Sequence, residues 1–108
     1  MRIYALKTCD TCKKAIKALR AAGHDPEVTD VRSDGVAAED MARFLDKFGD
    51  ALVNRASTTW RGLSEVNRAG DPADLLAKHP TLMKRPVIDA GGELYLGWKA
   101  DVQKALLG

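Results

Sequence analysis

The sequence predicts an α/β domain with a mixed sheet, in the order β-α-β, a helical insertion, then β-β-α. An apolar run at residues 2–6, a helical pattern and a β-branched run at residues 27–31 open the chain. Amphipathic helical patterns then fill about residues 34–80, and two short strands around a pair of glycines precede a last helix. Because hydrophobic periodicity separates helices from strands, these patterns fix the order of the elements. We therefore expect one parallel strand pair and one antiparallel hairpin in the same sheet.

The first three elements form a strand–helix–strand unit. Residues 2–6 (Arg-Ile-Tyr-Ala-Leu) are short and apolar, as in a buried strand. From Asp10 to Ala22 the apolar side chains fall on one helical face and the basic ones on the other, and Gly23 ends the helix. Residues 27–31 (Glu-Val-Thr-Asp-Val) form the second strand. The short links favour parallel strands joined by a right-handed crossover.

The predicted insertion begins with a helix-start cluster at residues 33–35. A clear amphipathic helix follows and ends at Gly49, with one further turn expected at residues 50–54. Its apolar face consists of Met41, Phe44, Leu45 and Phe48.

Two more helices are expected before the third strand. Cap hydroxyls at residues 57–59 predict a short helix from Trp60 to about Asn67. Asp71 and Pro72 predict the start of another helix. The block of roughly fifty residues is larger than a simple crossover needs. We therefore predict a single domain, residues 1–108, with a helical insertion at about 34–80.

The C-terminal part predicts a β-hairpin and a helix. Residues 86–89 and 93–97 flank Gly91-Gly92, a typical turn for two antiparallel strands. The closing helix spans residues 99–107 and buries Val102 and Leu106.

Composition excludes several classes of protein. The 108 residues are 45% hydrophobic and 30% charged, which argues against disorder and against a membrane protein. No apolar run reaches transmembrane length and no signal peptide opens the chain, so we expect a cytoplasmic protein. The formal net charge is only +2, with acidic and basic residues interleaved, so no nucleic-acid partner is expected.

Both cysteines lie in Cys9-Asp10-Thr11-Cys12, where the first strand gives way to the first helix. Free N–H groups and the dipole at a helix start stabilise a thiolate there. A C-x-x-C after the first strand, in this order of elements, is typical of a thioredoxin-like fold. Structural zinc normally needs four ligands, and His24 and His79 are too scattered to help, so no metal is predicted. Two ordinary packing cysteines are the remaining alternative.

We predict Cys9 as the nucleophile, because it precedes the helix and faces its unpaired N–H groups. Cys12, one turn further in, is a candidate resolving thiol. The positive charges of Lys7, Lys13 and Lys14 favour the thiolate, and the negative charge of Asp10 opposes it. The lysines also fit a solvated helix face, which is the alternative interpretation.

Other residues are candidates for the surroundings of Cys9. Arg85 and Pro86 open the third strand, and in thioredoxin-like folds the proline here is typically cis and packs beside the active thiol. Arg85 could then bind an oxyanion or a carboxylate, or could instead pair with a surface acid. Arg55 presents a planar fork suited to an anion, with a plain surface role as the alternative. We expect the pocket to include Thr8, Thr11 and Pro86.

These motifs together resemble the glutaredoxin-type arsenate reductase family, which includes the Spx transcription regulators. The resemblance spans nearly the whole chain and is closest to the short YffB-like subgroup. The resemblance rests on three parts of the sequence. The first is residues 3–4 together with 9–14, and the second is residues 52–55 (Leu-Val-Asn-Arg) together with 58–60 (Thr-Thr-Trp). The third is residues 79–88 (His-Pro-Thr-Leu-Met-Lys-Arg-Pro-Val-Ile).

The resemblance implies thiol chemistry that depends on glutathione or glutaredoxin, with no bound cofactor. In family arsenate reductases one cysteine attacks arsenate while three arginines bind the oxyanion. Cys9 matches that cysteine, and Arg55 and Arg85 match two of the arginines. At the third place the nearest cation is Lys99. Cys12 stands where arsenate reductases commonly have serine, and in this it is similar to Spx.

Three functions follow from these residues. The first is a glutathione- or glutaredoxin-linked thiol reductase of arsenate reductase type, an oxidoreductase. The second is an Spx-like regulator that binds RNA polymerase and uses Cys9 and Cys12 as a redox switch. The third is a family member that acts on another thiol substrate, without arsenate activity.

Overall fold

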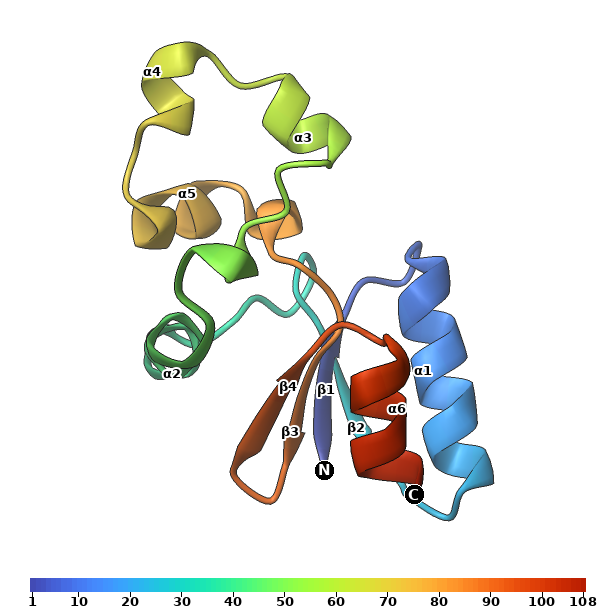
Figure 1. Ribbon diagram of the computed structural model, residues 1–108. Helices are drawn as coiled ribbons and strands as arrows, with labels where there is room; N and C mark the ends of the chain where they lie inside the picture. The colour runs from blue at the N-terminus through green and yellow to red at the C-terminus, as the bar shows by residue number, and fades with distance from the viewer. The chain divides into compact units, whose positions relative to one another are not determined.

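The computed structural model describes all residues from 1 to 108, and they form two compact units. The first unit contains residues 1–34 and 85–108, and the second contains residues 35–84. Figure 1 shows the sheet with two helices in the first unit, and helices joined by turns in the second.

The first unit is built on a four-stranded mixed sheet in the order β2-β1-β3-β4. Strand β1 (Arg2–Ala5) pairs in parallel with β2 (Glu27–Asp30) and antiparallel with β3 (Val87–Ala90). Strand β4 (Glu93–Leu96) completes the sheet at the other edge by antiparallel pairing with β3. The predicted α/β fold with a mixed sheet, as in thioredoxin-like proteins, is confirmed.

The β3–β4 hairpin turns on Gly91 and Gly92, as predicted. Ala90 pairs with Glu93, so the loop has only two residues, and their φ angles are +65° and +99°. Such a turn requires positive φ at both positions, which glycine adopts without steric cost. Asp89 Oδ1 accepts a hydrogen bond from the Gly92 N–H at 2.9 Å and so closes the turn.

Helices α1 (Asp10–Ala21) and α6 (Ala100–Leu107) share one core with the sheet. They lie side by side in Figure 1, and their apolar faces meet two central strands in a cluster of Ile3, Ala15, Leu19, Ile88 and Val102. His24, just after α1, adds a hydrogen bond between its Nε2 and the Leu106 carbonyl at 3.1 Å. Helix α1 is therefore held against β1 by a packed interior.

The second unit is helical. Helix α2 (Ala38–Phe48) ends at Gly49, where the predicted further turn is the 3₁₀ helix η1 (Gly49–Leu52). Helix α5 (Pro72–Lys78) begins at the Asp71 cap and is followed by the 3₁₀ helix η2 (Pro80–Leu82). Two backbone hydrogen bonds join the end of η1 and the segment after it to the C-terminal end of the unit: Asn54 N–H to Leu82 O at 2.8 Å and Lys84 N–H to Leu52 O at 2.7 Å. Its buried side chains include Phe44, Leu52, Leu75, Leu76 and Leu82.

One predicted element is wrong. The helix expected from Trp60 to about Asn67 is two single turns, α3 (Thr58–Arg61) and α4 (Glu65–Arg68). The Ser57 hydroxyl accepts from the Trp60 N–H, so the first turn starts earlier than expected. Ser64 then caps a new turn by accepting from the Asn67 N–H at 3.2 Å, which breaks the continuous helix.

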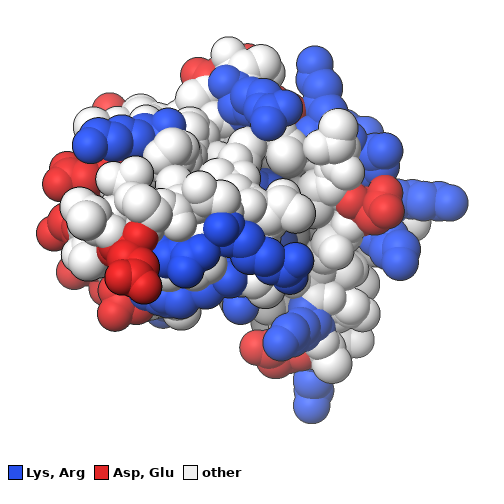
Figure 2. Space-filling view, turned by 90° about the horizontal axis from the view of Figure 1, so that it is seen from above, with Lys and Arg blue, Asp and Glu red and all other residues white.

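None of the helices combines the length and the apolar composition needed to cross a membrane. On the face shown in Figure 2, lysine and arginine side chains project at several separate places, with acidic side chains close to many of them.

Candidate active site

Cys9 occupies the N-cap position of α1, directly before the first helical residue. Its backbone is extended (φ −88°, ψ 113°), and its N–H donates to the Leu6 carbonyl at 3.0 Å in the turn that leaves β1. Its sulfur accepts the backbone N–H of Cys12 at 3.4 Å. The thiol thus takes the place that a serine or aspartate oxygen usually fills at a helix start.

The surroundings of Cys9 favour its thiolate. Partial burial raises the pKa of the Cys9 thiol, but hydrogen bonds from the Cys12 side chain and the Cys12 backbone N–H lower it. A hydrogen bond from Arg85 and the positive charge of that residue lower it further, and the net pKa lies below its usual value. Hydrogen bonds to the charged form therefore outweigh desolvation.

The pKa of the Cys12 thiol is shifted in the opposite direction. The residue is only 1% exposed. Burial, together with the hydrogen bond to Cys9 and the neighbouring Cys9 charge, raises the pKa of the Cys12 thiol to about 12. Cys12 therefore stays protonated at neutral pH, and the pKa values of the two thiols of the C-x-x-C are shifted in opposite directions.

Arg85 and Pro86 belong to the same unit as Cys9 and lie directly before β3. The Arg85–Pro86 peptide bond is cis, as expected, and Pro86 is fully buried. The Pro86 carbonyl accepts the Gly97 N–H at 2.8 Å, which joins the start of β3 to the end of β4. The half-buried Arg85 is thereby held on rigid backbone while it interacts with Cys9.

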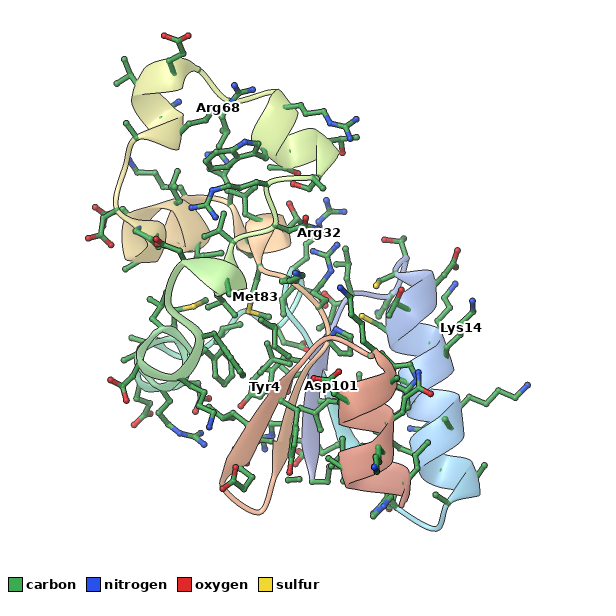
Figure 3. All side chains as sticks on the ribbon, in the orientation of Figure 1. Tyr4, Lys14, Arg32, Arg68, Met83 and Asp101 are labelled. Carbon is green, nitrogen blue, oxygen red and sulfur yellow. The ribbon has the colours of Figure 1, made fainter.

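The remaining predicted residues of this unit are exposed. Thr8 and Thr11 flank Cys9 in the chain and are open to solvent. Lys99 is the exposed N-cap residue of α6, and its carbonyl accepts the Gln103 N–H at 3.0 Å. Lys14 projects outward from α1 in Figure 3. After the hydrogen bonds from Cys12, Arg85 is the cation that lowers the pKa of Cys9.

Asp30 is a structural part of the site that the sequence did not reveal. It is buried at the end of β2, only 7% exposed, and its carboxylate accepts three backbone N–H groups. One is the N–H of Lys7 at 3.1 Å, two residues before Cys9, and the others are those of Arg32 and Ser33 at 2.9 Å. The hydrogen bonds from Ser33, Arg32 and Lys7 outweigh its desolvation and lower the pKa of Asp30. An acid placed between β-branched residues at the end of the strand was the only sequence signal.

A groove borders the buried thiol. Its volume is about 420 Å³, and it is mostly apolar, with two lysines and two aspartates among its lining residues. The lining includes Leu6, Lys7, Cys12, Ile16, Val28 and Asp30. No three side chains of histidine, cysteine, aspartate or glutamate gather anywhere as a set of metal ligands.

Arg55 lies in the second unit, between η1 and α3. Its exposed guanidinium donates to the Asp50 carbonyl at 3.3 Å and lies 5.3 Å from the centroid of the Trp60 ring. The sequence predicted the residue but not the contact with Trp60, because the two are brought together by the turn before α3.

Comparison with known proteins gives consistent matches over nearly the full length. The sequence model of the ArsC family matches residues 4–106. An uncharacterized protein of Haemophilus influenzae is 40% identical over 101 residues, which cover 89% of each chain. The solved structure of a YffB protein has a TM-score of 0.90 and 33% identity, covering 99% of this chain and 98% of that one. An arsenate reductase (ArsC) related protein from Brucella melitensis has a TM-score of 0.74 and 38% identity, covering 96% and 91%.

Proposed function

Because the chain belongs to the ArsC family, we propose that it is a thiol reductase of the arsenate reductase type, with Cys9 as nucleophile and glutathione as cosubstrate. One observation carries this proposal. Cys9 is a half-buried helix N-cap whose sulfur accepts the Cys12 N–H, and whose pKa is lowered by Cys12 and Arg85 despite burial. A lowered pKa at a partly accessible thiol is the usual mark of a reactive cysteine.

In the proposed reaction, two thiols together supply the two electrons that reduce arsenate to arsenite. The Cys9 thiolate attacks arsenic and a water molecule leaves as the As–S bond forms. A glutathione thiolate then attacks the Cys9 sulfur. The As–S electron pair returns to arsenic, arsenite is released, and Cys9 and glutathione share a mixed disulfide. A second glutathione, or glutaredoxin, attacks that disulfide and restores the Cys9 thiol.

Cys12 is proposed as an alternative resolving thiol. Its pKa of about 12 makes it a poor first nucleophile. Part of that rise comes from the neighbouring Cys9 charge, which disappears once Cys9 is in a mixed disulfide. Cys12 would then attack the Cys9 sulfur, expel glutathione and leave a Cys9–Cys12 disulfide for a further thiol partner to reduce.

We propose that three cationic side chains bind anions. Arg85 interacts with the thiol itself and suits an oxyanion at the reacting atom. Arg55 and Lys99 are proposed for the anionic groups of the substrate or of glutathione. Lysine at the third position offers a point charge rather than a planar fork, which favours a second candidate function: reduction of a glutathione mixed disulfide without arsenate turnover.

A coupled assay tests both candidates. The purified protein is supplied with glutathione, glutathione reductase and NADPH, and either arsenate together with glutaredoxin, or a small glutathione mixed disulfide without glutaredoxin, as substrate. We expect NADPH consumption that Cys9→Ser abolishes and Cys12→Ser retains at least in part. Turnover of the mixed disulfide alone selects the second candidate. Equal activity of wild type and Cys9→Ser would exclude Cys9 as the nucleophile.

A further inference from the structure

The short helical segment at residues 55–68 contains three arginines and one acid, Glu65, and none of the arginines forms an ion pair. Its three arginines, Arg55, Arg61 and Arg68, donate their hydrogen bonds to backbone carbonyls. The ion pairs of the chain lie elsewhere, between Arg2 and Glu27 and between Arg43 and Asp40. An anion approaching this segment would therefore not have to displace a carboxylate.

Two of these guanidinium groups lie against one indole ring. The Cζ atom of Arg55 is 5.3 Å from the centroid of the Trp60 ring, and that of Arg68 is 5.8 Å from it. Both distances are within the range of a cation–π interaction. Arg61 bonds to the Ala56 carbonyl instead and makes no such contact.

Arg68 also fixes the backbone that carries the ring. Its Nε donates to the Trp60 carbonyl at 3.1 Å and its Nη2 to the Arg61 carbonyl at 2.9 Å. Those carbonyls belong to the last residues of α3, which is too short to be stable alone. The half-buried Arg68 of α4 therefore holds α3, and with it the indole, in place (Figure 3).

We propose that Trp60 is a positioning residue that orients the guanidinium of Arg55 for an anionic ligand, and that Arg68 holds Trp60 in this role. The inference rests on the proposed function, in which Arg55 binds an anionic group of the substrate or of glutathione. An exposed arginine loses side-chain freedom when it binds a ligand, which weakens binding. A ring that already restricts Arg55 reduces this loss, while leaving the donors of the guanidinium edge available.

The principal test is a double-mutant cycle in the coupled assay, with glutathione as the varied substrate. Trp60→Leu removes the aromatic face, and we expect the KM for glutathione to rise about two- to fivefold, the range of an exposed cation–π contact. Trp60→Phe keeps the face and should stay near wild type. Arg55→Ala should raise KM at least as much, and adding Trp60→Leu to it should have little further effect. Additive effects, or no effect of Trp60→Leu, would overturn the proposal.

Arg61 provides the matched control for charge. Arg68→Ala and Arg61→Ala remove the same charge from the same segment, but only Arg68 contacts Trp60. We expect Arg68→Ala to raise KM more than Arg61→Ala. Equal effects would mean that the segment acts only through its net charge. This comparison stands even if Trp60→Leu does not fold.

A fluorescence titration separates this inference from the failure of the proposed function. In a Trp98→Phe background Trp60 is the remaining tryptophan, since the chain has two. We expect glutathione to change its emission, and the change to be lost with Arg55→Ala. An unresponsive emission would overturn the inference even if turnover depends on Cys9. A response in a protein without turnover would support the anion site and reject the reductase.

Discussion

The backbone N–H of Cys12 donates to the sulfur of Cys9 at 3.4 Å, and this relationship separates two chemically identical residues. Cys9 lies at the N-terminal end of α1, and its pKa is lowered. Burial and the Cys9 charge raise the pKa of Cys12 to about 12. The C-x-x-C thus contains one thiol whose pKa is lowered and one whose pKa is raised.

Selective alkylation should distinguish the two thiols. At pH 7, about one molecule in 10⁵ has an ionised thiol when the pKa of that thiol is about 12. We therefore expect iodoacetamide to label Cys9 at least about 100-fold faster than Cys12 in the folded, reduced protein. Mass spectrometry of fragments gives the site of labelling. Protein unfolded in urea is the control, in which both cysteines should react at similar rates. Faster labelling of Cys12 in the folded state would contradict the assignment.

Arg85 should control the reactivity of Cys9. Arg85→Gln removes a hydrogen bond and a positive charge that both lower the pKa of Cys9. The pKa should rise, and the labelling rate at pH 7 should fall by about three- to tenfold, as expected for a partly exposed charged partner. The measurement is the labelling rate from pH 5 to pH 9. Lys84→Gln, which removes the neighbouring exposed charge, should leave the profile unchanged.

The stability of the protein should fall at alkaline pH because of Cys12. In the unfolded chain its thiol ionises near a pKa of about 8.5, whereas the folded protein keeps the proton up to about 12. Between these values the folded state binds more protons, so the free energy of unfolding falls as pH rises, by at most about 1.4 kcal/mol per pH unit. Cys9 has the opposite sign. Its lowered pKa adds stability as pH rises through the folded value, and this contribution is complete above about 8.5.

Urea unfolding of reduced protein between pH 7 and pH 10.5 measures this effect. Cys12→Ala is expected to be less stable at pH 7, because a buried side chain is lost. Its free energy of unfolding should nevertheless fall less steeply above pH 9 than that of wild type. Parallel curves for the two proteins would show that Cys12 is not protonated in the folded state in this range.

Much of the fold follows from local patterns. The strands, α1, α2, α5, α6 and the Gly91-Gly92 turn are predictable because hydrophobic period, caps and turn residues agree there. The position of Cys9 follows from the same patterns, since the start of a helix can be read from the chain. The split between α3 and α4 could not be predicted, because the Ser64 hydroxyl accepts the Asn67 N–H, which in a continuous helix would donate to a backbone carbonyl.

Contacts between residues that are far apart in the sequence could not be predicted from it. The pKa of Cys9 depends on Arg85, which is far away in the chain and reaches it only through the pairing of β1 with β3. Asp30 meets Lys7 in the same way, through the parallel pairing of β1 and β2. Local propensity carries no information on such pairs, so they required the tertiary structure.

Asp30 should make a large contribution to stability. Its carboxylate accepts the N–H groups of Lys7, Arg32 and Ser33, and hydrogen bonds to a buried charged group are among the stronger ones. Asp30→Asn keeps the size but removes the charge and places an amide where only an acceptor fits. We expect the free energy of unfolding to fall by about 1–3 kcal/mol at pH 7, which corresponds to roughly 4–20 °C in Tm.

The pH dependence identifies the carboxylate as the cause. The folded pKa of Asp30 is lowered, so its contribution is complete above the unfolded value of about 3.9 and is lost as pH falls toward the folded value. Wild type and Asp30→Asn should therefore converge in stability below about pH 3.9, when both are followed by circular dichroism in urea. Asp34→Asn is the matched control, because the exposed Asp34 accepts only the Asp30 N–H, at 2.9 Å. It should cost less, and an equal loss from the two variants would show that burial and the additional hydrogen bonds of Asp30 add nothing.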